Sequence, residues 1–212
     1  MNSQPALNLT VATGGLIAAN VAVHLVRLVM APSLDRTVLM QFAFAPSLFM
    51  TASGGFSPPP EPMLWLSLIT YSFLHGDFLH LLVNMGFLLA FGTLIERRLG
   101  ARRFLAFYLV LALLSIAGTT ALYLITRKPV LVIGASGAIA GLFGAAARFA
   151  FPGGRGFWLG VVFIGINLAF GLISLSDFGG VRAIAWEAHI AGFLAGALLF
   201  PLFDRGAPAP FS

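Results

Sequence analysis

The chain has no cysteine and few charged residues of either sign. Without a thiol, disulfides, thiolate metal sites and a cysteine nucleophile are excluded, so covalent catalysis would have to use Ser, Thr, Lys, Asp or Glu. Only 9% of the 212 residues are charged and 59% are hydrophobic, and the mean hydropathy is +0.97. This composition lies outside that of soluble domains and indicates a protein of the lipid bilayer.

Acidic residues are the scarcer of the two charge types. Twelve Lys and Arg stand against seven Asp and Glu, which gives a net charge of +5 and a pI near 10.8. The basic residues are scattered singly or in short pairs between apolar runs, a pattern typical of charges that orient membrane segments. We therefore expect no nucleic-acid partner, for which a basic binding surface would be needed.

Six apolar runs divide the chain. A helix needs about 20 residues to cross roughly 30 Å of hydrocarbon, and each run approaches or exceeds that length. The first run is longer than a signal-peptide core and no basic segment precedes it, so we expect it to be retained. The sequence predicts an all-α membrane protein, a single domain over residues 1–212, with six transmembrane helices at about 9–30, 78–95, 104–126, 131–151, 157–175 and 183–203.

Arginines cluster between the second and third runs, at positions 97, 98, 102 and 103. By the positive-inside rule this connection faces the cytoplasm, and with six spans both termini then face the cytoplasm too. The compact size favours a multi-pass protein of a bacterial inner membrane.

A long connection over residues 31–67 would then lie outside. It contains LMQFAFAPSLFM (39–50), twelve largely apolar residues, which is too short to cross. We expect a first outside loop that is partly buried in the membrane interface.

Four polar side chains lie within or at the ends of the apolar runs and need an explanation. A polar side chain in hydrocarbon raises the free energy unless it is paired or faces a cavity. The four are His80, Asn84, Ser136 and His189. His80 and Asn84 are four residues apart and therefore share a helix face. Two interpretations of that pair stay open: hydrogen bonds that tie the bundle together, or a functional site.

Ser136 and His189 both lie in strips of small residues. Such strips let two helices approach closely, which would bring the serine and the histidine within hydrogen-bond reach. A neutral imidazole could then take the hydroxyl proton. Ser136 also stands near the start of its run, where free backbone N–H groups favour developing negative charge. The small residues are Gly137, Ala140, Gly141 and Gly144 in one strip, and Ala188, Gly192 and Gly196 in the other.

Other catalytic patterns are absent. Ala138 stands where the hydrolase elbow G-x-S-x-G requires glycine. His75 and His80 form no H-E-x-x-H pattern, so the zinc-protease signature is missing. A metal bound by His75, His80 and His189 stays an alternative, but we expect no metal and no cofactor.

Four strings together resemble the motifs of the rhomboid family of intramembrane serine proteases. They are HGDFLHLLVNM (75–85), IERRLG (95–100), GASG (134–137) and AHIAGFLAG (188–196), and the similarity spans roughly residues 65–200. The resemblance implies a rhomboid-like six-helix bundle in which Ser136 is the nucleophile and His189 the general base. It also implies an oxyanion hole formed by His80, Asn84 and the Ser136 backbone, and single-pass transmembrane proteins as substrates.

The resemblance assigns structural roles as well. It implies that Glu96 and Arg98 pair at the cytoplasmic interface and that His75 is structural, as are Gly137, Gly141, Gly192 and Gly196. In three places the sequence departs from the family. Leu66-Ser67 stand where a first-loop Trp-Arg is common, Ala140 replaces an aromatic residue that packs on the histidine, and Glu187 lies two residues before His189. We do not expect Glu187 to act as a triad acid, because it points about 200° away on a helix.

Two other functions stay open. A catalytically inactive rhomboid-like protein would bind membrane helices without cutting them, although such relatives typically lack the serine or the histidine. A transporter or proton pathway would use the membrane histidines, but internal repeats and mid-membrane acidic residues, which are usual in transporters, are not evident.

Overall fold

The computed structural model describes residues 9–51, 53–151, 154–175 and 185–204, and this part of the chain is mostly helical. Five of its helical segments are long and apolar enough to cross a membrane, and a sixth is shorter. The six are α1 (Val11–Leu28), α4 (Phe78–Phe87) continued by a π-helical turn (Leu88–Gly92) into α5 (Thr93–Leu99), α6 (Ala101–Thr126), α7 (Ser136–Ala150), α8 (Arg155–Leu175) and α9 (Trp186–Phe203).

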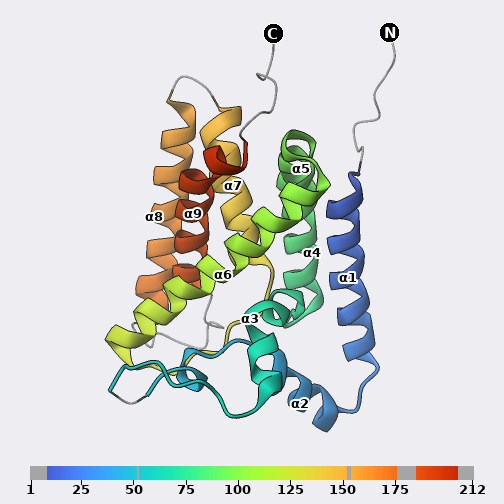
Figure 1. Cartoon of the computed structure of the whole chain (residues 1–212), viewed down its shortest axis with the longest axis vertical. Coiled ribbons are helices and arrows are strands. Elements are labelled where there is room, and N and C mark those ends of the chain that lie inside the picture. The colour runs from blue at the N-terminus through green and yellow to red at the C-terminus, as the bar shows by residue number, and fades with distance from the viewer. Residues whose placement is uncertain (1–8, 52, 152–153, 176–184, 205–212) are drawn as a thin grey trace.

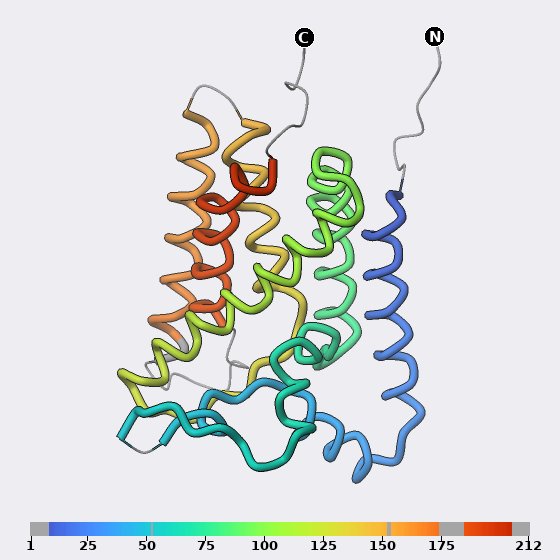
Figure 2. The backbone as a smooth tube through the Cα atoms, in the orientation of Figure 1, coloured from blue at the N-terminus to red at the C-terminus, as the bar shows by residue number. Residues whose placement is uncertain are grey.

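These helices form an upright bundle that α6 crosses obliquely (Figures 1 and 2). The all-α membrane architecture predicted from the apolar runs is therefore confirmed. The boundaries differ by several residues, since the second segment continues to Leu99 and the third begins at Ala101. The last predicted run begins at 183, outside the described residues, and α9 begins at Trp186.

The fourth helix differs most from its predicted span. It begins at Ser136, whereas the apolar run begins at 131. The residues before it are extended, and Val132 pairs with Phe44 through backbone hydrogen bonds of 2.7 and 3.0 Å. Hydrophobicity could not distinguish the two conformations, because the extended segment is as apolar as a helix. At about 1.5 Å per residue, α7 is about 22 Å long, less than the roughly 30 Å of a hydrocarbon core.

Helices α7 and α9 pack backbone to backbone. A Cβ added to Gly192 would collide with the carbonyl oxygen of Gly137, and one added to Gly196 would collide with that of Gly141. The predicted role of these small residues in close helix approach fits this geometry. Because Ser136 opens α7 and His189 lies in the first turn of α9, the contact fixes how the two side chains meet.

The first loop folds over the end of the bundle opposite to the start of α1 and the end of α9 (Figure 1). It contains α2 (Pro32–Phe42), 3-10 turns at Pro46–Leu48 and Pro62–Leu66, and the short α3 (Ser67–Thr70). In the predicted interfacial stretch, Phe44 and Phe49 are buried against the protein, whereas Met40 and Leu48 are exposed. The apolar stretch therefore packs partly into the core instead of lying wholly against lipid.

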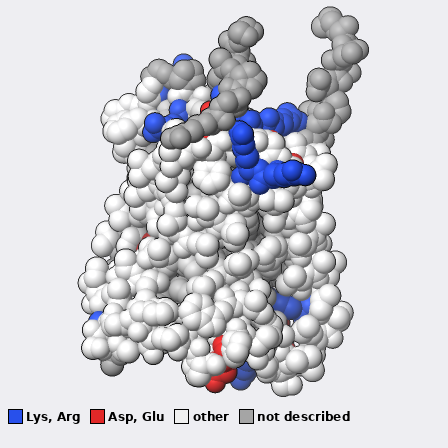
Figure 3. Space-filling view, viewed as in Figure 1, with Lys and Arg blue, Asp and Glu red and all other residues white. Residues whose placement is uncertain are grey.

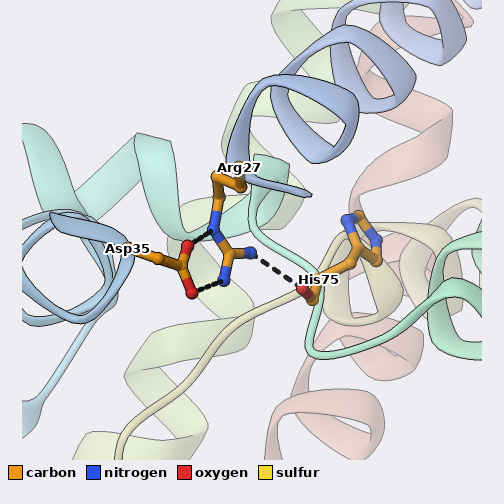
Figure 4. Close-up of polar contacts among 3 residues, drawn as sticks. All are labelled: Arg27, Asp35 and His75. Atoms are coloured by element: carbon orange, nitrogen blue, oxygen red, sulfur yellow. Dashed lines mark hydrogen bonds and ion pairs between the residues drawn. The ribbon is translucent and has the colours of Figure 1, made fainter. Parts of the chain in front are cut away.

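Arg27, in the last turn of α1, holds this loop in place (Figure 4). Its Nε donates to Oδ1 of Asp35 at 2.7 Å, and its Nη2 donates to Oδ2 at 3.3 Å. Its Nη1 donates to the backbone oxygen of His75 at 2.8 Å. One guanidinium thus joins α1, α2 and the segment that leads into α4.

Most charged side chains gather at the two ends of the molecule, with a broad, almost uncharged belt between them (Figure 3). Arg97, Arg98, Arg102 and Arg103 lie around the α5–α6 turn, at the same end of the bundle as the start of α1 and the end of α9 (Figure 1). The belt is what a multi-pass membrane protein requires.

The expected Glu96–Arg98 pair is wrong, although both residues tie helices together. Glu96 accepts from the Ala12 and Thr13 backbone N–H groups at 2.9 and 2.7 Å, and from the hydroxyls of Thr13 and Thr10, so it caps α1. Arg98 instead pairs with Asp204, Nε to Oδ1 at 2.7 Å. The physical reason is helix geometry, because residues two apart do not face each other.

Candidate active site

Ser136 and His189 meet directly. The hydroxyl oxygen Oγ of Ser136 lies 2.7 Å from Nε2 of His189, across 53 residues of sequence. The predicted contact between these side chains is therefore confirmed, whereas their chemical roles stay a prediction. The distance is within the range required for proton transfer from a hydroxyl to an imidazole.

The opposite ring nitrogen of His189 contacts Asn167, a residue that the sequence analysis missed. Nδ1 of His189 lies 2.9 Å from Oδ1 of Asn167, in the middle of α8. The Asn167 amide nitrogen donates to the Phe163 backbone oxygen at 2.9 Å. A signal was available, because an amide inside an apolar run calls for the same explanation as His80 or Asn84.

His80 and Asn84 converge on the turn that precedes Ser136. A Cβ on Gly134 would lie 2.8 Å from Nε2 of His80 and 3.5 Å from Nδ2 of Asn84. Gly134 has φ +110°, a left-handed conformation that favours glycine, and its N–H donates to the Tyr71 carbonyl at 2.9 Å. The loop can therefore pass close to both side chains and start α7 beside them.

His80 and Asn84 both present hydrogen-bond donors on the side that faces Gly134. The Gly76 N–H donates to Nδ1 of His80 at 3.4 Å, which leaves Nε2 as the protonated nitrogen of the neutral ring. Nδ2 of Asn84 is buried and has no protein partner in the structure. The helix start that carries His80 is fixed by Asp77, whose Oδ1 accepts from the His80 backbone N–H at 2.8 Å.

A cavity of about 1060 Å³ contains these groups. Residues of several helices and of the first loop's neighbouring segments line it, both polar and apolar. The residues that line it include Ser136, His189, His80, Asn84, Val83, Phe87, Phe143, Phe163, Glu187, Thr119, Lys128, Arg27, Asp35 and Asp77. The cavity is large enough for water and for a short stretch of extended peptide.

His75 is completely buried beside this site, and its ring lies 5.0 Å from that of His80 in an edge contact. Burial, with the neighbouring His80, lowers the pKa of the His75 imidazole to about 4, so the ring is neutral at physiological pH. Across the described ranges, no group of three or more His, Asp or Glu side chains is arranged to hold a metal ion. His75, His80 and His189 form no such group among the described residues.

Two of the three departures from the family pattern find a structural counterpart. Where Ala140 replaces an aromatic residue, His189 is held by Asn167 instead. Where the first-loop Trp-Arg is missing, Arg27 supplies an anchor from α1, and Trp65 packs its ring against Phe49 and Phe56 at 5.6 and 6.1 Å.

Comparison with known proteins gives matches of one kind. A family model described as "Rhomboid domain" matches residues 61–205. The chain is 44% identical over 80 residues to the putative rhomboid protease YdcA of Bacillus subtilis, an alignment that covers 38% of this chain and 39% of that protein. It is 35% identical over 137 residues to the rhomboid protease GluP of the same organism, over 62% of this chain and 25% of that protein. The matches thus span well under half the length of either relative.

Proposed function

This chain belongs to the rhomboid family, and from that premise we propose that it is an intramembrane serine endopeptidase with Ser136 as nucleophile and His189 as general base. The observation that carries the proposal is the 2.7 Å contact between the serine hydroxyl and the imidazole inside a cavity of the bundle. The names of the two relatives support a protease at the level of the family.

The proposed reaction has two steps. The Ser136 hydroxyl gives its proton to Nε2 of His189 while Oγ forms a bond to the scissile carbonyl carbon. His189 then gives that proton to the leaving nitrogen as the C–N bond breaks, which leaves an acyl group on Ser136. In the second step His189 takes a proton from water, whose oxygen attacks the acyl carbon, and returns it to Oγ as the acid product leaves.

The negative oxygen formed in each step needs donors close to Ser136. The N–H groups of the first helical turn have no acceptor within the helix, and Ser136 is the first residue of α7. The Asn84 amide nitrogen is a buried donor with no protein partner, and Nε2 of His80 lies on the same side of Gly134. These groups are the proposed oxyanion hole, and in other enzymes each such donor lowers the barrier by about 3 kcal/mol.

The proposed substrates are single-pass transmembrane proteins, which reach the site from the bilayer. A peptide bond in an intact helix is shielded by its own hydrogen bonds, so the substrate helix would have to unwind near its end, and the polar groups that line the cavity would solvate the exposed backbone. The proposed location is a bacterial inner membrane, with the end of the bundle that carries the arginine cluster in the cytoplasm.

The test is cleavage of a panel of single-span substrates by purified protein in detergent and in proteoliposomes. We expect Ser136→Ala and His189→Ala each to lower kcat at least about 10³-fold, because neither group can act without the other. Asn84→Ala should lower kcat about 10²-fold. Ser67→Ala removes another buried serine, whose hydroxyl donates to the Leu64 carbonyl, and should leave cleavage unchanged.

Labelling by a fluorophosphonate separates this proposal from an inactive helix-binding protein. An activated serine should react, and the label should disappear in Ser136→Ala but persist in Ser67→Ala. Cleavage that survives in Ser136→Ala, or a wild-type protein that neither cleaves nor labels, would overturn the proposal.

A further inference from the structure

We propose that Asn167 is the positioning residue of this site: its side-chain oxygen accepts the Nδ1–H of His189 and keeps Nε2 free as the base that faces Ser136. The inference rests on the proposed function and extends it from two residues to three on separate helices, Ser136 on α7, Asn167 on α8 and His189 on α9.

The orientation of the Asn167 amide fixes the roles of the ring nitrogens. Its nitrogen donates to the Phe163 carbonyl at 2.9 Å, and rotation of the amide by 180° would set two acceptor oxygens against each other. The oxygen must therefore face His189, where it can only accept. Nδ1 at 2.9 Å then carries the proton, and Nε2 has the lone pair that the Ser136 hydroxyl requires.

Burial makes this contact costly to lose. The Asn167 side chain is 5% exposed, and all other buried residues of α8 between 155 and 173 are glycines. An amide inside hydrocarbon is unfavourable unless its polar atoms are paired, and here both ends of the amide are paired. Asn167 is thus the one buried polar side chain that this stretch of α8 presents to the rest of the bundle.

An amide oxygen is suited to the task. It holds the ring in one tautomer during the first proton transfer, and its dipole stabilises the imidazolium that forms. Cysteine proteases with a Cys-His-Asn arrangement use an amide in the same position. Glu187, the acidic residue nearest to His189 in the sequence, is not needed as a third member of the catalytic group.

The contact also couples the base to the position of a helix. Helix α8 packs mainly against α7 and α9, so it lies at the periphery of the bundle (Figure 1). A displacement of α8 by a few ångströms would break the bond to His189 without moving α7 or α9. The ring would then lose its fixed tautomer even though Ser136 stayed in place.

The first experiment compares Asn167→Leu with Asn20→Leu. Asn20 is a matched control, because it is a buried membrane asparagine whose nitrogen also donates to the carbonyl four residues earlier, that of Leu16 at 2.8 Å. We expect Asn167→Leu to lower kcat about 10- to 100-fold at nearly constant KM, as loss of an orienting partner does at other histidines. Asn20→Leu should leave kcat unchanged, and Asn167→Asp, which retains an acceptor for Nδ1 but loses the donor to the Phe163 carbonyl, should recover only part of the activity.

The second experiment does not depend on cleavage. Nitrogen NMR of selectively labelled histidine reports which ring nitrogen is protonated, with His189 assigned by its absence in His189→Ala. In wild type and in Asn20→Leu, His189 should be protonated at Nδ1 alone. In Asn167→Leu, it should be a mixture of the Nδ1- and Nε2-protonated forms.

A wild-type His189 protonated at Nε2, or a form unchanged by Asn167→Leu, would overturn the inference whatever the cleavage assay gives. Equal losses of kcat in the two leucine variants would overturn it as well. If no substrate is cut but the tautomer responds as expected, the proposed protease function fails and the positioning role stands.

Discussion

Helices α7 and α1 bury residues of different types. The buried residues of α7 are ten in number and almost all Gly and Ala, whereas those of α1 are Ala12, Thr13, Asn20 and His24, three of them polar. Helix α1 turns large apolar residues such as Leu25 and Leu28 outward. Since lipid is as apolar as a leucine side chain, hydrophobicity cannot hold membrane helices together. One helix is held by close backbone approach, the other by a few polar contacts.

Helix α8 makes contacts of both kinds, because a Cβ on Gly156 would collide with the backbone oxygen of Ala147 on α7, while Asn167 contacts His189. It presents Asn167 and glycines to the bundle, as α1 presents the groups that contact Glu96 and carries Arg27 in its last turn. The backbone-packed pair α7–α9 carries Ser136 and His189, whereas α1 and α8 supply the polar groups that anchor the first loop and contact His189. Variants that disrupt the close backbone contacts should therefore lower the stability of the whole protein. Variants that disrupt the polar contacts should have smaller and more local effects.

The largest effect is expected from Gly192→Ala. The added methyl group meets the Gly137 carbonyl, which is backbone and cannot move aside, so α7 and α9 must separate. We expect a loss of about 3 kcal/mol in the free energy of unfolding, together with loss of cleavage. The measurement is unfolding in detergent. The control is Gly165→Ala on α8, where a Cβ meets nothing within 4 Å; it should be neutral or stabilise by up to about 1 kcal/mol.

A smaller effect is expected from Glu96→Gln. The two carboxylate oxygens accept four hydrogen bonds from the start of α1, and a glutamine would place an NH₂ group against donors. We expect a loss of about 2 kcal/mol, with α1 fraying first. Hydrogen exchange at residues 11–14 reports this directly. Glu61→Gln, an exposed loop substitution, should change nothing, and equal exchange in the two variants would refute the capping role.

The smallest effect is expected from Arg27→Met. It removes a partly exposed ion pair with Asp35 and one bond to the His75 carbonyl, for which we expect a loss of about 1 kcal/mol. The consequence should be local, namely faster proteolysis of the first loop at unchanged fluorophosphonate labelling. Arg36→Met, an exposed neighbour on α2, serves as control. A large loss in the free energy of unfolding of the whole protein in Arg27→Met would contradict this local role. It would mean that α1 stabilises the central bundle as well as the first loop.

Much of the fold follows from the sequence, because continuous apolar runs of this length have few alternatives to helices in lipid. The meeting of Ser136 and His189 also follows, since their small-residue strips leave room for close contact. The start of α7 does not follow. Residues 131–135 are apolar enough for a helix, but Val132 pairs with Phe44, 88 positions away, and Gly134 has a positive φ.

The polar partners were the hardest to predict. A buried carboxylate such as Glu96 must find donors, but nothing near it in the sequence indicates that they lie at Thr10 to Thr13. Arg27 and Asp35 have opposite charges and are only eight residues apart. Their pairing could not be predicted, because it requires the chain to reverse direction between them. Asn167 could have been singled out as a buried amide, but its contact with His189 depends on where α8 stands.

The short length of α7 has a further physical effect. Because the helix starts at Ser136, its positive end faces the cavity inside the bundle and not bulk solvent, in surroundings of lower dielectric constant than bulk water. Charges inside such a region are screened little by dissolved ions. The attraction of this helix end for an anion beside Ser136 should accordingly be almost independent of ionic strength, unlike that of helix ends exposed to bulk solvent.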